Sequence, residues 1–223
     1  MGIRVIVFDF DGTIADTHRT IIEITNSFSS DFGFQPVSEE ELLRLRNLSS
    51  REILKQSQIS IFKIPFLMRK VQGQLRKEIV NLELIEGMKE CLLELKSKGY
   101  KLGIITSNFK ENVVRFLEIK QLNNLFDFVY SGTTLFGKHK VINKFLRQHN
   151  LRADEAIYVG DETRDIDAAK KSNVKVIAVG WGFNLPSILK QHQPDFLIEK
   201  PHQISEVVLG NYQNFGELSM DNG

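Results

Sequence analysis

Two aspartates separated by one residue follow a hydrophobic run near the start of the chain. The run is VIVF at residues 5–8, and Asp9 and Asp11 come directly after it, with Gly12 and Thr13 next. Burial and mutual repulsion both oppose the ionisation of two carboxylates at the end of a hydrophobic strand. A bound divalent cation would offset that cost, so we expect this pair to serve chemistry.

Two later stretches also place polar side chains directly after apolar runs. IITSN at residues 104–108 ends in a threonine, a serine and an asparagine, and YVGDETRD at residues 158–165 contains Asp161 and Asp165. The carboxyl ends of parallel strands lie along one edge of a sheet, where open α/β folds bind ligands. The three strand ends are therefore expected to converge on one site.

The four aspartates supply the hard oxygen ligands that Mg²⁺ prefers. Mg²⁺ is commonly held by one or two carboxylates together with waters and phosphate oxygens of a substrate, so the pattern indicates a magnesium site facing a phosphate. The candidate metal ligands are Asp9, Asp11, Asp161 and Asp165.

Groups that bind phosphate are also available near these strand ends. Thr106 offers a hydroxyl, and the turn at Ser107 and Asn108 offers backbone N–H groups to an anion. A lysine from LFGKHK would balance the charge of a phosphate, with Lys138 as the first candidate and Lys140 as the second. The phosphate-binding candidates are Asp11, Gly12, Thr106, Ser107, Asn108 and Lys138.

A cation site facing phosphate-binding groups indicates phosphoryl transfer. In such a site Asp9 could act as the nucleophile and form an aspartyl-phosphate. Asp11 could protonate the leaving oxygen and then activate water. The candidate catalytic residues are Asp9, Asp11, Thr106 and Lys138.

Apolar runs predict the strands that position these groups. The runs lie at residues 3–10, 101–106, 156–160 and 174–179, with shorter candidates at 128–130 and 196–198. They are nearly continuous rather than alternating, which is typical of a parallel sheet covered on both faces. Helical patterns at 86–99, 140–150 and 164–173 lie between them. The succession predicts a doubly wound, Rossmann-like α/β fold.

Residues 17–82 interrupt this succession. They contain helical stretches at 20–32, 39–46, 50–56 and 66–80, and SSRE at 49–52 has the form of a capping box. A helical segment of about 65 residues after the first strand is too long for an ordinary crossover. We predict a helical cap domain at 17–82, inserted into a core formed by residues 1–16 and 83–209, and a flexible tail at 210–223.

The motifs resemble those of a known superfamily. DFDGT (9–13), IITSN (104–108), a downstream lysine and VGDETRD (159–165), in this order, are similar to the four motifs of the haloacid dehalogenase-like (HAD) hydrolases. The resemblance extends over residues 3–209. It implies a Rossmann-like core with a helical cap between the first two motifs, and it implies Mg²⁺ as cofactor.

The resemblance also implies a role for each matching residue. Asp9 matches the nucleophile and Asp11 the general acid and base, while the Asp9 carboxylate and the Asp11 backbone carbonyl would share Mg²⁺ with Asp161. Asp165 matches a residue that supports the metal, and Thr106 matches the phosphate-binding hydroxyl. The lysine motif lacks the proline that this branch often carries, so Lys138 and Lys140 both remain candidates.

The second aspartate argues against a dehalogenase, and the DKTGT of transport ATPases is absent. DGTIADT (11–17) and GDETRDIDAAKKSNVKVIAVGWG (160–182) are most similar to phosphoglycolate phosphatase-type enzymes. The resemblance thus implies hydrolysis of a small phosphorylated metabolite. A phosphomutase of the β-phosphoglucomutase type and a non-catalytic binding module on a HAD scaffold are the alternatives.

Composition limits the setting of this activity. Apolar residues make up 42% and charged residues 26% of the chain, the net charge is +1, and there is a single cysteine. These values are typical of a globular protein in a reducing compartment. We expect a cytoplasmic monomer or homodimer with neither nucleic-acid nor membrane partners. The five histidines are expected at the surface or in loops, and Arg44, Arg46 and Arg51 of the cap more often on a solvated helix face than against substrate.

Overall fold

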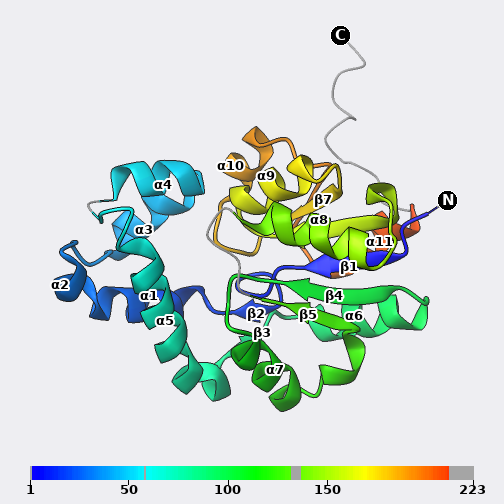
Figure 1. The fold of residues 1–223 in the computed structure, drawn as a ribbon, viewed down its shortest axis with the longest axis horizontal. Coiled ribbons are helices and arrows are strands. Elements are labelled where there is room, and N and C mark those ends of the chain that lie inside the picture. Colours follow the sequence, from blue (N-terminus) through cyan, green and yellow to red (C-terminus); the bar gives the residue numbers. More distant parts are fainter. Residues whose placement is uncertain (1, 58, 132–136, 211–223) are drawn as a thin grey trace, which may run out of the picture.

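The computed structural model describes residues 2–57, 59–131 and 137–210. Within them six parallel strands form one sheet in the order β5-β4-β1-β6-β7-β8 (Figure 1). Strand β1 is central and pairs with β4 on one side and β6 on the other. The strands are β1 (Val5–Phe8), β4 (Lys101–Ile105), β5 (Phe128–Tyr130), β6 (Ala156–Gly160), β7 (Lys175–Val179) and β8 (Phe196–Ile198).

Helices cover both faces of the sheet, as the continuous apolar runs predict. Val5 and Val7 of β1 belong to the apolar cluster under one set of helices, whereas Ile6 and Phe8 belong to the cluster under the other set. The first set is α8 (Lys138–Gln148), α9 (Thr163–Lys171) and α10 (Pro186–Gln191). The second set is α6 (Met88–Ser97), α7 (Lys110–Ile119) and α11 (His202–Leu209). The prediction of a doubly wound α/β fold is confirmed.

We call residues 17–82 the helical insert, and it lies beside the sheet at the left of Figure 1. Its helices are α1 (His18–Ser27), α2 (Ser29–Phe32), α3 (Glu39–Arg46), α4 (Ser50–Gln56) and α5 (Ile64–Glu78). The capping box predicted at Ser49 and Glu52 is present at the start of α4. The single helix predicted at 20–32 is instead two helices, because the backbone departs from helical geometry at Phe28, between α1 and α2. Helix α2 then ends at Gly33, whose φ is +74°.

Both connections between the insert and the sheet run through a short antiparallel ribbon. Strand β2 (Ala15–Asp16) enters the insert, and strand β3 (Glu83–Leu84) leaves it, with Ala15 opposite Leu84. The insert therefore starts and finishes at one place, beside the end of β1.

Hydrogen bonds hold the far side of the insert against the loop that follows β7. Arg46 donates to the carbonyl oxygens of Gly182 and Phe183 at 3.1 and 2.8 Å. The side-chain amide of Asn184 donates in return to the carbonyl oxygens of Arg46 and Leu48. The insert thus contacts the sheet domain at a point well removed from the ribbon.

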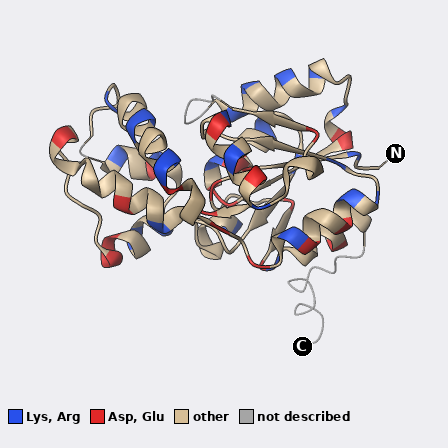
Figure 2. Ribbon diagram, turned by 90° about the horizontal axis from the view of Figure 1, so that it is seen from below, with Lys and Arg blue, Asp and Glu red and all other residues tan. Residues whose placement is uncertain are grey.

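Short 3₁₀ helices supplement the α-helices at three places in the described part of the chain: η1 (Ile79–Asn81), η2 (Asn123–Leu125) and η3 (Ala153–Glu155). Basic and acidic residues are interspersed over both the insert and the sheet domain (Figure 2). None of the helices in the described residues combines the length and the apolar character that crossing a bilayer requires. The predicted tail at 210–223 lies outside the described residues, apart from Gly210, which ends α11.

Candidate active site

Asp9 stands directly after the central strand. Its backbone N–H donates to the carbonyl oxygen of Val159 at 2.8 Å, which continues the pairing of β1 with β6 by one residue. One carboxylate oxygen accepts the backbone N–H of Phe10 at 2.7 Å, and the residue is 2% exposed. The sheet and the following turn therefore fix the position of this carboxylate.

Lys138 lies between two carboxylates of the site. Its Nζ is 2.5 Å from Asp9 Oδ2 and 2.5 Å from Asp165 Oδ1. Burial lowers the pKa of Lys138, but the charges of Asp165 and Asp9 outweigh burial and raise it well above the usual value, so the ammonium keeps its charge. Lys140 is exposed. Helix α8 begins two residues before the predicted start, and this first turn brings Lys138 rather than Lys140 to the aspartates.

Asp9, Asp161 and Asp165 form a buried acidic cluster. One carboxylate oxygen of each lies within 4.8 Å of those of the other two. Burial, reinforced by Asp9 and opposed by Lys138, raises the pKa of Asp165 to about 7. The charges of Lys138 and Arg164 therefore do not offset the burial of Asp165 and its repulsion by Asp9. A hard divalent cation with oxygen ligands matches both the donor set and the missing positive charge, so these residues fit Mg²⁺.

Asp161 has hydrogen-bond partners on both of its carboxylate oxygens. Thr13 Oγ1 donates to Oδ1 at 3.1 Å, while the Phe183 N–H donates to Oδ2 at 2.7 Å. His18 Nε2 lies 3.1 Å from the same Oδ2. Burial raises the pKa of Asp161, but His18 and the Phe183 N–H outweigh the effect of burial, so the pKa of Asp161 lies below its usual value. Asp161 thus remains ionised inside the fold.

His18 is a site residue that the sequence did not reveal. It begins α1 and lines a cavity between the insert and the loop that follows β4, contrary to the expectation of a surface or loop role. Burial lowers its pKa, but the hydrogen bond and charge of Asp161 raise it above the usual value. Residue 12 is a glycine because the site has no room for a side chain there: a Cβ at Gly12 would lie 2.1 Å from His18 Nε2 and 2.4 Å from Asp161 Oδ2. The DGT sequence after Asp9 thus makes room for His18.

Asp11 has a different environment from Asp9. Its two carboxylate oxygens accept the side-chain amide of Asn108, each at 3.1 Å, and the carboxylate does not belong to the acidic cluster. Burial and the charge of Asp9 raise the pKa of Asp11 to about 7. A carboxyl group with such a pKa is close to half protonated at neutral pH and can both donate and accept a proton.

The loop after β4 carries the predicted phosphate-binding residues. Thr106 is fully buried, and its Oγ1 accepts the backbone N–H of Asn108 at 3.0 Å. Asn108 Oδ1 accepts the Asn112 amide, so α7 fixes the side chain that reaches Asp11. The carbonyl oxygen of Ser107 accepts Gln72 Nε2 of the insert at 2.5 Å. The loop is thus held from both the sheet domain and the insert.

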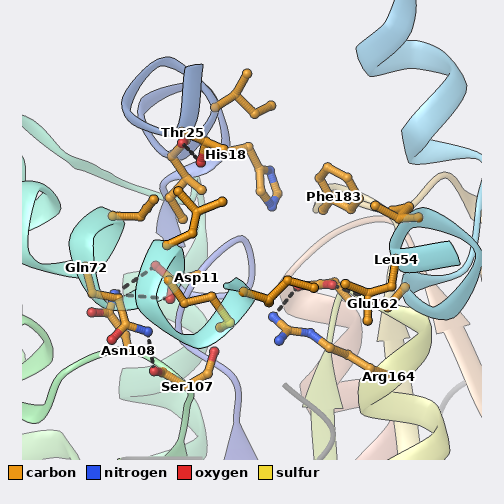
Figure 3. Close-up of a pocket in the computed structure, with 18 of the residues that line it drawn as sticks. Asp11, His18, Thr25, Leu54, Gln72, Ser107, Asn108, Glu162, Arg164 and Phe183 are labelled. Carbon is orange, nitrogen blue, oxygen red and sulfur yellow. Dashed lines mark hydrogen bonds and ion pairs between the residues drawn. The ribbon is translucent and has the colours of Figure 1, made fainter. Parts of the chain in front are cut away.

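A cavity of about 350 Å³ lies between this loop and the insert (Figure 3). Its floor includes Asp11, Ser107, Asn108 and Arg164, and its roof is made of aliphatic side chains of α1, α4 and α5. Helix α9 begins beside α4, where the Ser50 N–H donates to Thr163 Oγ1 at 3.1 Å. This contact joins the insert to the motif that contains Asp161 and Asp165.

The arginines of the insert do not line this cavity within the described residues. Arg44 pairs with Glu41 and donates to Gln56, Arg46 holds the loop after β7, and Arg51 lies 3.8 Å from Asp167. The arginine that reaches the cavity is Arg164, from the sheet domain. The position of Arg164 directly before Asp165 was the sequence signal for a site residue. The sequence does not tell whether the Arg164 side chain points toward the site or away from it.

A family model described as haloacid dehalogenase-like hydrolase matches residues 6–179. The chain belongs to this family. Phosphoglycolate phosphatase of Synechococcus elongatus is 35% identical over 205 residues, which cover 92% of this chain and 97% of that protein. Pyrophosphatase PpaX of Bacillus mycoides is 26% identical, over 90% of this chain and 94% of that protein.

Solved structures agree on the fold. A predicted phosphatase from Clostridium acetobutylicum superposes with a TM-score of 0.80 at 21% identity, covering 94% of this chain and 100% of the other. The resemblance to the HAD superfamily, inferred from the four motifs, is therefore confirmed. The prediction of a hydrolytic enzyme of this family is confirmed as well, and its assignment to the phosphatases of the family agrees with these relatives.

Proposed function

We propose that the protein is a Mg²⁺-dependent phosphatase that hydrolyses a small phosphomonoester through an aspartyl-phosphate on Asp9. The observation that carries the proposal is the contrast between the two aspartates after β1. Asp9 is ion-paired with Lys138, whereas burial and Asp9 raise the pKa of Asp11 to about 7. A carboxylate held by an ion pair and a carboxyl group with a raised pKa are suited to two roles, a nucleophile and an acid.

The carboxylates of Asp9, Asp161 and Asp165 would hold Mg²⁺, together with the backbone carbonyl of Asp11. When bound, the ion would neutralise charge on the phosphoryl oxygens. Lys138 adds a second positive charge on the same side, and Thr106 supplies a hydroxyl for a phosphoryl oxygen. These groups stabilise the negative charge that the transition state spreads over the phosphoryl oxygens.

The first step is attack of an Asp9 oxygen on phosphorus. The new O–P bond forms as the bond to the leaving oxygen breaks, and Asp11 gives its proton to that oxygen. Asn108 keeps the Asp11 carboxyl in place through its amide. In the second step Asp11 takes a proton from water, the water oxygen attacks phosphorus, and Asp9 is released together with inorganic phosphate. The insert excludes bulk water from both steps.

The relatives support a substrate of the phosphoglycolate kind. The 35% identical protein of Synechococcus elongatus is named a phosphoglycolate phosphatase, and the next relative is named a pyrophosphatase. Both of the compounds in these names carry a second anionic group close to the bond that is broken. We take phosphoglycolate as the first substrate to test and pyrophosphate as the second.

The test is phosphate release by the purified protein from phosphoglycolate, pyrophosphate, sugar phosphates and nucleotides, with Mg²⁺ and with excess chelator. We expect steady release that requires Mg²⁺. Phosphorus NMR of the sugar phosphates follows isomerisation in the same samples. An isomerised sugar phosphate formed without net phosphate release would replace the phosphatase by a mutase. If the protein released phosphate from none of these compounds, the proposal would be contradicted.

A further inference from the structure

The cavity beneath the insert lies on the side of the site that faces a leaving group. Asp11, the proposed proton donor, lines it, whereas Asp9, Thr106 and Lys138 are not among the described residues that do. A group that protonates the leaving oxygen must face the leaving half of the substrate. Insert side chains that share the cavity with Asp11, and Arg164 at the start of α9, are therefore positioned to contact that half, while Ser107 and Asn108 are the predicted ligands of the transferred phosphoryl group.

Arg164 is the cation of this cavity. Among the described lining residues it is the only lysine or arginine. Figure 3 shows its side chain extending from α9 toward the Asp11 side of the cavity, with Glu162 beside the guanidinium. The arginine side chain is only 10% exposed. A cation in such a place has little access to water.

The guanidinium is only partly satisfied by the protein. Nη2 donates to Glu162 Oε1 at 2.5 Å, but Nε and Nη1 are buried without a hydrogen-bond partner in the described part of the chain. Unpaired buried donors of a charged group carry a substantial cost. A guanidinium stays charged throughout the pH range in which proteins fold. Two of its nitrogen donors therefore remain without a protein partner among the described residues.

The rest of the cavity strengthens the case for an anion at this point. Aliphatic side chains form the roof, among them Leu67 and Val71 of α5 and Ile53 of α4. Apolar surroundings exclude water and so increase the attraction between a guanidinium and an anion. These aliphatic side chains carry no charge, and His18, the basic side chain that the described insert residues contribute to the cavity, lies against Asp161.

We infer that Arg164 is a specificity-determining residue that binds a second anionic group, a carboxylate or a phosphate, on the leaving half of the substrate. This inference rests on the proposed phosphatase function. It predicts that the cavity prefers short phosphorylated acids to neutral alcohol phosphates, because only the former carry an anionic group for Arg164. It also assigns this selection to the sheet domain and not to the insert arginines, which the sequence placed more often on a solvated helix face.

The test compares substrates that differ in the second charge. Phosphoglycolate and pyrophosphate carry it, and 2-hydroxyethyl phosphate replaces the carboxylate of phosphoglycolate by a neutral CH₂OH. We expect Arg164→Met to reduce the preference in kcat/KM for phosphoglycolate over 2-hydroxyethyl phosphate by about 100-fold. Arg164→Lys should restore part of that preference. Arg44→Met, in an exposed arginine of the insert, is the matched control and should leave the preference unchanged.

Equal losses on charged and neutral substrates would overturn the inference, since Arg164 would then act on the transferred group or on the fold. Thermal unfolding of each variant identifies a folding defect. Selective loss on phosphoglycolate alone or on pyrophosphate alone identifies which anion Arg164 binds.

Binding gives a second, independent measurement. Calorimetric titration of phosphoglycolate into the Asp9→Asn protein, with and without Arg164→Met, measures affinity without turnover. We expect binding to weaken by about 100-fold when the arginine is lost. Unchanged affinity would overturn the inference. A wild-type protein that binds phosphoglycolate through Arg164 but hydrolyses nothing would contradict the proposed function while upholding the anion site.

Discussion

The catalytic site and the roof of the adjoining cavity are built in opposite ways. The catalytic site draws on strand ends and first helical turns, and two of its charged side chains have fixed partners: Lys138 contacts two carboxylates, and Asp161 is hydrogen-bonded on both oxygens. The roof is made of aliphatic side chains of the insert, which pack without directional bonds. Chemistry at phosphorus requires fixed distances, whereas exclusion of water requires only a covering apolar surface.

The first prediction tests the catalytic site by changing its proposed nucleophile. Asp9→Asn should reduce kcat by about 10⁴-fold or more, because an amide oxygen does not form the acyl phosphate. Circular dichroism should show a retained fold. Asp31→Asn alters an exposed acid of the insert and is the control that should keep wild-type rates. Turnover within tenfold of wild type in Asp9→Asn would show that Asp9 is not the nucleophile.

The second prediction separates the two candidate lysines. Lys138→Met leaves Asp9 and Asp165 without their shared counter-charge, so the free energy of unfolding should fall by about 3–5 kcal/mol. Activity should fall by about 100-fold or more. Lys140→Met, two residues away and exposed, should change neither quantity. Urea unfolding and phosphate release measure both effects. Similar losses in the two variants would contradict the assignment of the lysine to residue 138.

The third prediction concerns the seating of the insert. Arg46→Met removes the hydrogen bonds to the carbonyl oxygens of Gly182 and Phe183 without touching the floor. We expect KM to rise by about tenfold with kcat within a factor of about two, because the roof is held less firmly over the same chemistry. Steady-state kinetics with Arg44→Met as control measures this. A large fall in kcat at unchanged KM would mean that the roof takes part in the chemical step.

The smallest effect concerns Cys91, which lies on the sheet-domain helix α6. Burial raises the pKa of this thiol to about 12 from an ordinary value of 9.0. At pH 8 its thiolate fraction is about 10³-fold below that of an ordinary thiol, so alkylation should be slow until urea unfolds the chain. The unfolded thiol ionises first as pH rises, so this contribution to stability is complete below pH 9 and declines above it.

Iodoacetamide labelling followed by mass spectrometry, with and without urea, measures the protection of Cys91. Urea midpoints between pH 8 and 10.5, compared with those of Cys91→Ala, measure the linked loss of stability. Fast labelling in the folded protein would contradict the burial of Cys91 and indicate that the sheet domain opens around α6.

Most of the fold was accessible from the sequence because the sheet is buried on both faces. Continuous apolar runs predicted the six strands, and helices α3 and α4 agree with the predicted ranges. The break at Phe28 escaped prediction, because apolar periodicity continues across it and only the backbone changes direction. The ribbon strands β2 and β3 escaped as well, since two-residue strands have no periodicity.

The catalytic site could be foreseen where chemistry restricts residue type, as at Asp9, Asp11 and Asp161. Residues that act through contacts with parts of the chain far away in the sequence could not be predicted. His18 meets Asp161 across 143 positions of the chain. Arg164 stands beside a predicted residue, yet the burial of its two unpaired donors is a property of the folded chain that its sequence position does not reveal. The choice between Lys138 and Lys140 depended on a helix start, which a sequence defines only to within a few residues.

The β2–β3 ribbon has a consequence for how such a protein can diversify. Because Ala15 faces Leu84, the two ends of the insert lie side by side. A segment whose ends are adjacent can be exchanged for another of different length or shape without altering the path of the host chain. The aliphatic roof is thus a replaceable module, whereas Arg164 belongs to the host and would be retained in such an exchange.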